Sequence, residues 1–586
     1  MALIGQMKLA DFCLKLYRGD LERLCGYEYV PQKKEYIPGT EKSDPLPRST
    51  PEAQGVPSKL VEQFLRDLAA LKGADTHSVV ILRHGVQIAQ AHFKPYRGDY
   101  PHILYSLSKT VTATAVGFAV QEGLLSLDDR LVDLFSDKAL PIPLRNGRLN
   151  ALTIRHLLTM QSGVKFNELG SVLERDWAKG FLQSEFAFEP GSRFSYNSMN
   201  SYMLSAAVCR KAGMGLVEYL APRLFAPLGI RGVQWETCPN GIEKGGWGLM
   251  LRPEDMAKLG LLYLQKGCYS VDGRMRRLLS VDWVRQATAN QTGCCEGAPH
   301  GYGFHIWLCK RPGVYNFNGM FGQYVIVLPK SDMVVAITGG SRNLMPESGT
   351  LGLVQDTFGG RELLSAGPLP KDIRALKSMV RTMQGLTLLK KEVLPRRTPA
   401  SLFRRLAGRK KEPTNAERRY NGTQYSLSKS FGSLLPLILQ CVHNNFTGGL
   451  QKIGFAFQPG ECLITVTEHD TLYVIPAGTD GVPRYTNITI NGEPYHLGSY
   501  ARWTTDEDDR DVLKLYLSFV ETPDTRIIKC IFEDGGKLTV KFDERPSASL
   551  AFQMMTDSFQ LDLHINDYIS HRLHKLLLPV AEGVKE

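Results

Sequence analysis

Two strand-rich segments far apart in this chain bracket a long helical stretch, and this order limits the folds open to the first half. Residues 78–88 alternate as a β-hairpin with His84-Gly85 at the turn. Residues 318–340 predict two further strands. Helices are expected between these segments, in the ranges 153–163, 198–212 and 253–266. Strands that enclose helices favour an α+β fold: an antiparallel sheet flanked by helices, with an inserted helical region.

The second half of the chain has a different pattern, in which short β-prone runs follow one another closely. The runs fall between residues 421 and 553, and their spacing predicts an all-β barrel or sandwich. A chain of 586 residues exceeds what one hydrophobic core usually supports. We therefore expect five parts: an N-terminal helix and loop leader (1–55), an α+β domain (56–365), a basic linker (366–420), a β-rich domain (421–553) and a helical C-terminal tail (554–586).

The net charge of +11 comes from one region of the chain. Between Lys371 and Arg419 there are 15 basic and four acidic residues, an excess that equals the net charge of the whole chain. The remainder is balanced, which argues against a general nucleic-acid surface. The basic stretch is interpreted as a solvated connector between domains, with binding of an anionic partner as the alternative.

The spacing of the cysteines and the length of the apolar runs bear on the cellular location of the protein. Eleven cysteines are scattered without regular spacing, and Cys294-Cys295 is the one vicinal pair. No spacing typical of a zinc site occurs, and no run approaches the about 18 apolar residues of a membrane span. Residues 1–24 predict an amphipathic helix rather than a signal peptide, with membrane-surface binding as a second interpretation. A cytoplasmic location with reduced thiols is the simplest expectation.

The candidate chemistry begins at Ser106-Leu107-Ser108-Lys109, at the head of an apolar run rich in alanine and threonine. If this run is a helix, Ser106 and Lys109 share one face, because residues three apart are neighbours on a helix. A serine hydroxyl needs a base beside it to attack a carbonyl carbon, and a lysine in a dry environment can lose its charge and help to supply one.

The same five letters, Tyr-Ser-Leu-Ser-Lys, occur again at residues 425–429 and provide an internal comparison. Gly432 and Pro436 follow this second copy and would break a helix early. The residues around Ser426 alternate as in a strand, so we interpret the second copy as structural.

Further blocks join Ser106-x-x-Lys109 in a familiar order. They are Thr153-Ile154-Arg155-His156-Leu157-Leu158 with Ser162-Gly163, Tyr196-Asn197-Ser198, Gly245-Gly246-Trp247-Gly248-Leu249 with Asp255, and Gly319-Met320-Phe321-Gly322-Gln323. Over roughly residues 55–365 the chain resembles the serine β-lactamase and penicillin-binding-protein superfamily. The nearest branch contains class C β-lactamases, family VIII esterases and 6-aminohexanoate-dimer hydrolases. The resemblance implies a β-lactamase-like serine hydrolase domain at 56–365.

The resemblance also implies roles for individual residues. Ser106 takes the place of the acyl-accepting nucleophile, and Lys109 that of the motif lysine. Tyr196 takes the place of the tyrosine that acts with this lysine as general base. An ammonium group beside Tyr196 would favour its phenolate, so the pair could remove the proton of Ser106. The alternative for Tyr196 is a tyrosine that only packs in its loop.

Two positions depart from the family pattern. Ser198 stands where the Tyr-x-Asn motif has asparagine, and Phe317, before Asn318-Gly319, stands where a lysine or histidine is usual. Without that cation the carboxylate of a β-lactam would lose its partner, so neutral esters or amides are favoured. We therefore treat Ser198, Phe317, Gly319 and Gln323 as candidate substrate-binding residues; the alternatives are turn geometry for Gly319 and a plain strand residue for Gln323.

The developing oxyanion also needs donors, and two backbone N–H groups suffice. Those of Ser106 and Met320 are the candidates, since Gly319 would let the strand come close to the substrate. The sequence thus predicts a serine hydrolase acting on a small-molecule ester or amide through an acyl-serine, without a metal or organic cofactor. An acyltransferase and a non-catalytic scaffold are the alternatives. For the β-rich domain, three roles stay open: forming a wall of the cleft, forming a homodimer, or binding a partner.

Overall fold

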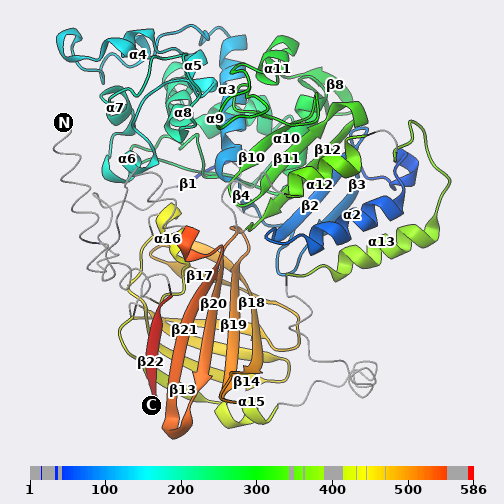
Figure 1. Ribbon diagram of the computed structural model, residues 1–586, viewed down its shortest axis with the longest axis vertical. Helices are drawn as coiled ribbons and strands as arrows, with labels where there is room; N and C mark the ends of the chain where they lie inside the picture. Colours follow the sequence, from blue (N-terminus) through cyan, green and yellow to red (C-terminus); the bar gives the residue numbers. More distant parts are fainter. Residues whose placement is uncertain are drawn as a thin grey trace. The chain divides into compact units, whose positions relative to one another are not determined.

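The computed structural model describes residues 33–36, 43–341, 349–360, 363–388, 414–430, 432–443, 445–468, 470–550 and 578–586, together with Lys15. The chain forms two compact units (Figure 1). The larger unit contains Pro31–Phe93 and Arg97–Leu386, and the smaller contains Lys94–Tyr96 and Thr387–Glu586. The helix expected within residues 1–24 and the linker residues 389–413 lie outside the described residues.

A six-stranded antiparallel sheet forms the centre of the larger unit. In spatial order its strands are β3 (Val86–His92), β2 (Thr76–Arg83), β12 (Met333–Gly339), β11 (Gln323–Leu328), β10 (Tyr315–Gly319) and β9 (Trp307–Leu308). The β2–β3 hairpin turns at His84 and Gly85, whose φ angles of 51° and 76° suit a tight hairpin turn. Strands from both ends of the unit thus meet in one sheet, which confirms the α+β prediction.

Helices cover both faces of this sheet. On one face lies α10 (Pro253–Leu264), where a Cβ on Gly260 would come within 2.6 Å of side-chain carbons of Val325 and Val334, so this glycine permits close packing. The other face carries α2 (Ser58–Ala70), α12 (Gly349–Phe358) and α13 (Ile373–Gly385), of which α2 and α13 lie side by side (Figure 1). Helix α13 falls within the predicted basic linker (366–420), whereas the structure places it in the larger unit.

The inserted region packs mainly around α3 (Ser108–Gln121) and α8 (Ser198–Ala212). Both are buried along most of their length and belong to the main hydrophobic core. Asn197 caps α8 by accepting a hydrogen bond from the N–H of Met199, and Gly213 ends it with a φ of 69°. The other helices here are α4 (Leu131–Leu134), α5 (Ile154–Leu158), α6 (Glu168–Leu173), α7 (Trp177–Leu182), α9 (Leu216–Leu220) and α11 (Val281–Ala287).

A second, four-stranded sheet positions the start of α3. Its order is β1 (Lys33–Tyr36), β5 (Val233–Glu236), β6 (Leu249–Leu251) and β4 (His102–Ile103). The N–H of Leu104 continues the pairing by donating to Leu249 O at 2.8 Å, and Leu249 N–H donates to Ser108 Oγ at 3.2 Å. The short 3₁₀ turn Tyr105–Leu107 is therefore held between β4 and α3. A separate hairpin pairs β7 (Cys268–Val271) with β8 (Arg274–Arg277).

The smaller unit is a closed β-barrel. Its ten-stranded sheet is closed by a pairing of Gly478 in β16 with Tyr500 in β18. In spatial order the strands are β16 (Thr471–Gly478), β15 (Glu461–Glu468), β14 (Leu450–Gln458), β13 (Thr423–Leu427), β22 (Val580–Lys585), β21 (Lys537–Arg545), β20 (Thr525–Phe532), β19 (Asp511–Phe519), β18 (Glu493–Thr505) and β17 (Arg484–Ile490). Of the predicted alternatives, the barrel is the correct one. Two short helices accompany it, α15 (Asn415–Tyr420) and α16 (Leu437–His443).

The end of the C-terminal tail differs from its prediction; residues 554–577 of the predicted tail lie outside the described residues. Residues 580–585 form strand β22 between β13 and β21, not a helix. Ala581 and Gly583 are buried and alternate with exposed residues, which is the period of a strand.

No helix in the described part of the chain combines the length and the apolar character needed to cross a membrane.

Candidate active site

Ser106 and Lys109 meet at the junction between the 3₁₀ turn and α3. Lys109 Nζ donates a hydrogen bond to Ser106 Oγ at 2.9 Å and a second one to Gly246 O at 2.8 Å. The lysine is 1% exposed, whereas Ser106 is half-buried, so solvent reaches the serine. The preceding residue, Tyr105, has a φ of 47°, a strained conformation for a non-glycine residue that the surrounding packing maintains.

Burial sets the charge of this lysine. It lowers the pKa of Lys109 to about 7, while the carboxylate of Glu168 acts in the opposite direction. A substantial fraction of Lys109 is therefore a neutral amine near pH 7, and a neutral amine can accept the proton of Ser106.

Tyr196 joins this pair from the loop before α8. Lys109 Nζ lies 4.9 Å from the centre of the Tyr196 ring. The pKa of Tyr196 is raised above its ordinary value, chiefly by burial and in smaller part by the negative charge of Glu168. A hydrogen bond with Ser106 acts in the opposite direction and lowers this pKa. The raised pKa differs from the phenolate that the sequence analysis expected, because burial disfavours the charged form of the phenol.

The end of strand β10 reaches the same place. A Cβ on Gly319 would lie 2.1 Å from Leu104 O, so glycine alone lets β10 approach the backbone that leads into Ser106. Met320 follows directly and is half-buried in the turn to β11, in which Phe321 and Gly322 have φ angles of 62° and 91°. Met320 thus follows directly on the glycine at which β10 approaches the backbone that leads into Ser106.

Gln323 and Phe317 are both buried within the fold around this turn. The Gln323 side chain is 0% exposed. Its Nε2 donates to Met320 O at 3.0 Å and to Gly339 O at 2.8 Å. Its Oε1 accepts from Gly339 N–H at 3.1 Å. Phe317 is 1% exposed and packs edge-on against Tyr263, with ring centres 5.2 Å apart. Gln323 thus braces the turn that carries Met320, and Phe317 supports β10 from the core.

Ser198 and Asn197 lie at the start of α8, next to Tyr196. Ser198 is buried, and its backbone N–H donates to Glu168 Oε1 at 3.2 Å. Asn197 Nδ2 donates to Val164 O at 3.1 Å and to Phe166 O at 2.9 Å, in addition to its role as helix cap. These contacts fasten the Tyr196 loop to the segment that carries Glu168.

The part of the chain that carries these residues matches a known family. Residues 61–347 match the family model described as Beta-lactamase. This stretch is a β-lactamase family domain. It includes Ser106, Lys109, Tyr196 and the β10–β11 turn.

Among curated proteins, the chain is similar to enzymes of two kinds. Monacolin J acid methylbutanoyltransferase of Aspergillus terreus is 29% identical over 204 residues, 31% of this chain and 46% of that protein. 6-Aminohexanoate-dimer hydrolase of Paenarthrobacter ureafaciens is 23% identical over 289 residues, 44% of this chain and 71% of that protein. The chain spans about half the length of the first of these relatives.

Solved structures similar to this chain include a putative 6-aminohexanoate-dimer hydrolase from Bacillus anthracis and a family VIII carboxylesterase. The first has a TM-score of 0.46 and 19% identity, and the match covers 56% of this chain and 90% of that one. The second has a TM-score of 0.43 and 16% identity, and covers 53% and 98%, respectively.

Three residues of the β-lactamase family domain that the sequence analysis did not select also lie at this site. Trp307 of β9 stacks on Tyr196, with ring centres 5.6 Å apart. His305 holds α3 to α8: its backbone carbonyl accepts from Thr110 Oγ1 at 2.7 Å, and its Nε2 lies 2.9 Å from Ser201 Oγ. Burial, assisted by Lys109, lowers the pKa of His305 to about 3, so the imidazole is neutral. The third residue is Glu168, and none of the three stands in a motif that the sequence would single out.

Proposed function

We propose that the β-lactamase family domain hydrolyses an ester or amide of a small molecule through an acyl-Ser106 intermediate. The observation that carries the proposal is the 2.9 Å hydrogen bond between Lys109 Nζ and Ser106 Oγ, made by a buried lysine whose pKa is lowered to about 7. A nucleophile paired with a base that is neutral near the working pH is the arrangement that acyl transfer requires.

The reaction follows from the positions of these groups. The neutral amine of Lys109 takes the proton of Ser106 as Oγ bonds to the carbonyl carbon of the substrate. The N–H groups of Ser106 and Met320 donate to the oxyanion that forms. The carbonyl re-forms as the bond to the leaving group breaks, and the leaving group receives the proton from Lys109 through the phenol of Tyr196. Water then attacks the acyl-serine by the same route and releases the acid.

The surroundings of Ser106 favour a substrate without negative charge. Phe317 stands at the position expected to hold a cation and is buried in the core. The carboxylate of Glu168 acts electrostatically on both Lys109 and Tyr196, so it would also repel an anionic substrate. The half-buried ring pair of Tyr196 and Trp307 offers an apolar surface beside the nucleophile. In this proposal Gly319 and Ser198 border the substrate, while Phe317 and Gln323 act by positioning β10 and its turn.

An acyltransferase is the second candidate, and the curated relatives favour keeping it. One is named a methylbutanoyltransferase and another a dimer hydrolase. Both activities share the acyl-serine and differ in the group that accepts the acyl chain. Adding increasing concentrations of an alcohol or an amine during turnover distinguishes them: a hydrolase continues to release mainly acid, whereas a transferase diverts most of the acyl group to the added acceptor.

Labelling with a fluorophosphonate tests the proposal against a non-catalytic scaffold. We expect stoichiometric labelling of the wild-type protein and of Ser426→Ala, and no labelling of Ser106→Ala. Ser426 is the matched control because it occupies the same five-letter context, but on strand β13, with its Oγ 2.5 Å from Glu586 Oε1. Labelling that persists in Ser106→Ala, or a wild-type protein that is not labelled, would refute the assignment of Ser106.

A further inference from the structure

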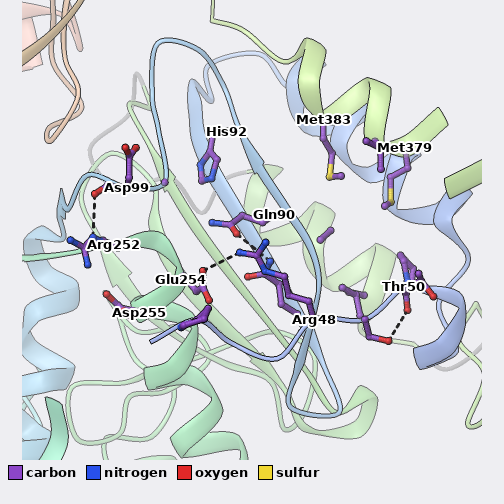
Figure 2. Close-up of a pocket in the computed structure, with 18 of the residues that line it drawn as sticks. Arg48, Thr50, Gln90, His92, Asp99, Arg252, Glu254, Asp255, Met379 and Met383 are labelled. Carbon is purple, nitrogen blue, oxygen red and sulfur yellow. Dashed lines mark hydrogen bonds and ion pairs between the residues drawn. The ribbon is translucent and has the colours of Figure 1, made fainter. Parts of the chain in front are cut away.

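A cavity lies in the larger unit, away from Ser106 (Figure 2). Its volume is about 760 Å³, within the range typical of sites for small organic ligands. It borders edge strand β3, whereas the candidate active site borders β10, four strand steps away in the same sheet. At ~4.8 Å per step, that separation is roughly 19 Å. None of Ser106, Lys109 and Tyr196 lines this cavity.

One wall of the cavity is apolar and adaptable. Helix α13 contributes Leu376, Met379, Val380 and Met383, which follow the spacing of one helix face. Figure 2 shows Met379 and Met383 on this helix, at the side of the cavity opposite His92 and Asp99. Val380 is 36% exposed although it is apolar. Methionine side chains adjust readily to the shape of an apolar ligand.

The facing wall presents hydrogen-bond donors. Residues 47–49 pair with the edge of β3, where Gln87 N–H donates to Pro47 O at 2.8 Å and Ser49 N–H donates to Gln87 O at 3.0 Å, so the backbone fixes Arg48 at the cavity. Among the described residues, the Arg48 guanidinium has one partner, Glu254 Oε2 at 3.9 Å, and its side chain is 64% exposed. Gln90, on the same wall, uses its Oε1 to accept from Gln87 Nε2, and its own Nε2 has no hydrogen bond to a described residue.

The acidic residues around the cavity already have partners, so they leave Arg48 available. Asp44 is 3.4 Å from Arg231, Asp99 is 2.6 Å from Arg97, and Asp255 is 2.8 Å from Lys258. Glu254 Oε1 accepts from Leu46 N–H at 2.5 Å, which leaves only its other oxygen for the long contact with Arg48. Five guanidinium N–H groups and the amide of Gln90 can thus receive the two oxygens of one carboxylate. The same acidic residues disfavour a ligand with more than one negative charge.

We propose that this cavity binds a monocarboxylate with an apolar chain, its carboxylate on Arg48 and Gln90 and its chain along the Met379–Met383 face of α13. The site is separate from the acyl chemistry, and the proposal does not depend on the activity assigned to Ser106.

The test uses the full-length Ser106→Ala protein, in which the active-site serine cannot be acylated. Binding is measured by calorimetry with octanoate, octan-1-ol and acetate, and by the NMR shifts of ¹³C-labelled methionine methyl groups. We expect octanoate to bind at least tenfold more tightly than the alcohol of the same chain length or the short acid, and to shift the Met379 and Met383 signals.

Two further variants in the same background locate the site. Arg48→Met should weaken octanoate binding at least tenfold, because the carboxylate loses its charged partner. Arg276→Met is the matched control, since Arg276 is also exposed and makes a similarly long ion pair, 3.6 Å, with Asp272. Failure of octanoate to bind, equal binding of octan-1-ol, or unchanged binding by the Arg48→Met variant would each overturn the proposal.

Discussion

At the scale of single residues, the chemistry depends on the charge of Lys109. The pKa of this side chain is lowered to about 7 by burial, and the base must be neutral to accept a proton. Activity should therefore be lost below pH 7 and should rise to a plateau above it. The raised pKa of Tyr196 keeps its phenol protonated across this range, so no loss due to this residue is expected on the alkaline side.

Glu168 should tune this profile. Its carboxylate raises the pKa of Lys109, so the neutral variant Glu168→Gln should move the acidic limb of kcat/KM to lower pH while keeping an acceptor for Ser198 N–H. The exposed Glu218, changed to glutamine, is the control and should leave the limb in place. A limb that does not move in Glu168→Gln, or that moves upward, would contradict the electrostatic role given to this residue.

The sequence predicts part of this site and misses the rest for physical reasons. Ser106 and Lys109 were predictable because one turn of helix fixes their spacing. Glu168 and His305 were not, since their approach to Lys109 depends on where α6 and the loop before β9 lie in the folded domain. The phenolate expected for Tyr196 rested on a nearby ammonium group alone, whereas burial, which raises the pKa of this phenol, is a property of the folded domain that a sequence does not reveal.

At the scale of elements, the proposed oxyanion site depends on the approach of β10 to the 3₁₀ turn. A methyl group on Gly319 would lie 2.1 Å from Leu104 O, so Gly319→Ala must move β10 away from Ser106. We expect kcat to fall by about 100- to 1,000-fold, the usual loss for one oxyanion donor. The control is Gly352→Ala on α12, where a Cβ meets nothing within 4 Å. A folded Gly319→Ala variant that kept more than a third of wild-type kcat would contradict the role given to the β10–β11 turn.

Elements with local signals were easier to predict than those held by distant partners. Helix α8 matches its predicted range of 198–212, because Asn197 and Gly213 supply a cap at each end. Strand β22 was missed because its pairing partners, β13 and β21, lie elsewhere in the sequence. Helix α13 lies in the most basic stretch of the sequence, and this charge predicts a solvated linker. Its apolar face packs in the larger unit only once the domain is folded.

At the scale of the whole molecule, the barrel unit contains a buried group of charged residues. Asp524, between β19 and β20, is 0% exposed. Burial raises the pKa of Asp524 to about 7, and this is the largest influence on it. A hydrogen bond with Thr522 lowers the pKa and the charge of Glu544 raises it. The charges of His443 and Arg526 lower it. Arg526 Nη1 lies 2.9 Å from Glu544 Oε2, and Glu544 accepts from Leu437 N–H at the start of α16. These groups fasten α16 to the barrel.

This arrangement makes barrel stability depend on pH. The folded barrel keeps a proton on Asp524 that the unfolded chain releases near pH 4. The stability linked to this group is therefore present below about pH 4 and is lost as pH rises through 7. Between pH 5 and pH 8 the wild-type protein should lose roughly 3 kcal/mol of stability relative to Asp524→Asn. Denaturant unfolding at both pH values measures the difference, with the exposed Asp534→Asn as control. Equal pH dependence in wild type and Asp524→Asn would exclude the effect.

The proposed reaction requires that Ser106 carries the acyl group during turnover. The most direct measurement is rapid mixing with a p-nitrophenyl ester of a neutral short-chain acid, followed by acid quenching and peptide mass spectrometry. We predict a burst of p-nitrophenol stoichiometric with the protein, and a peptide that carries one acyl group on Ser106 and is absent from Ser106→Ala. Turnover without a burst, with the Ser106 peptide unmodified at every time point, would contradict the account.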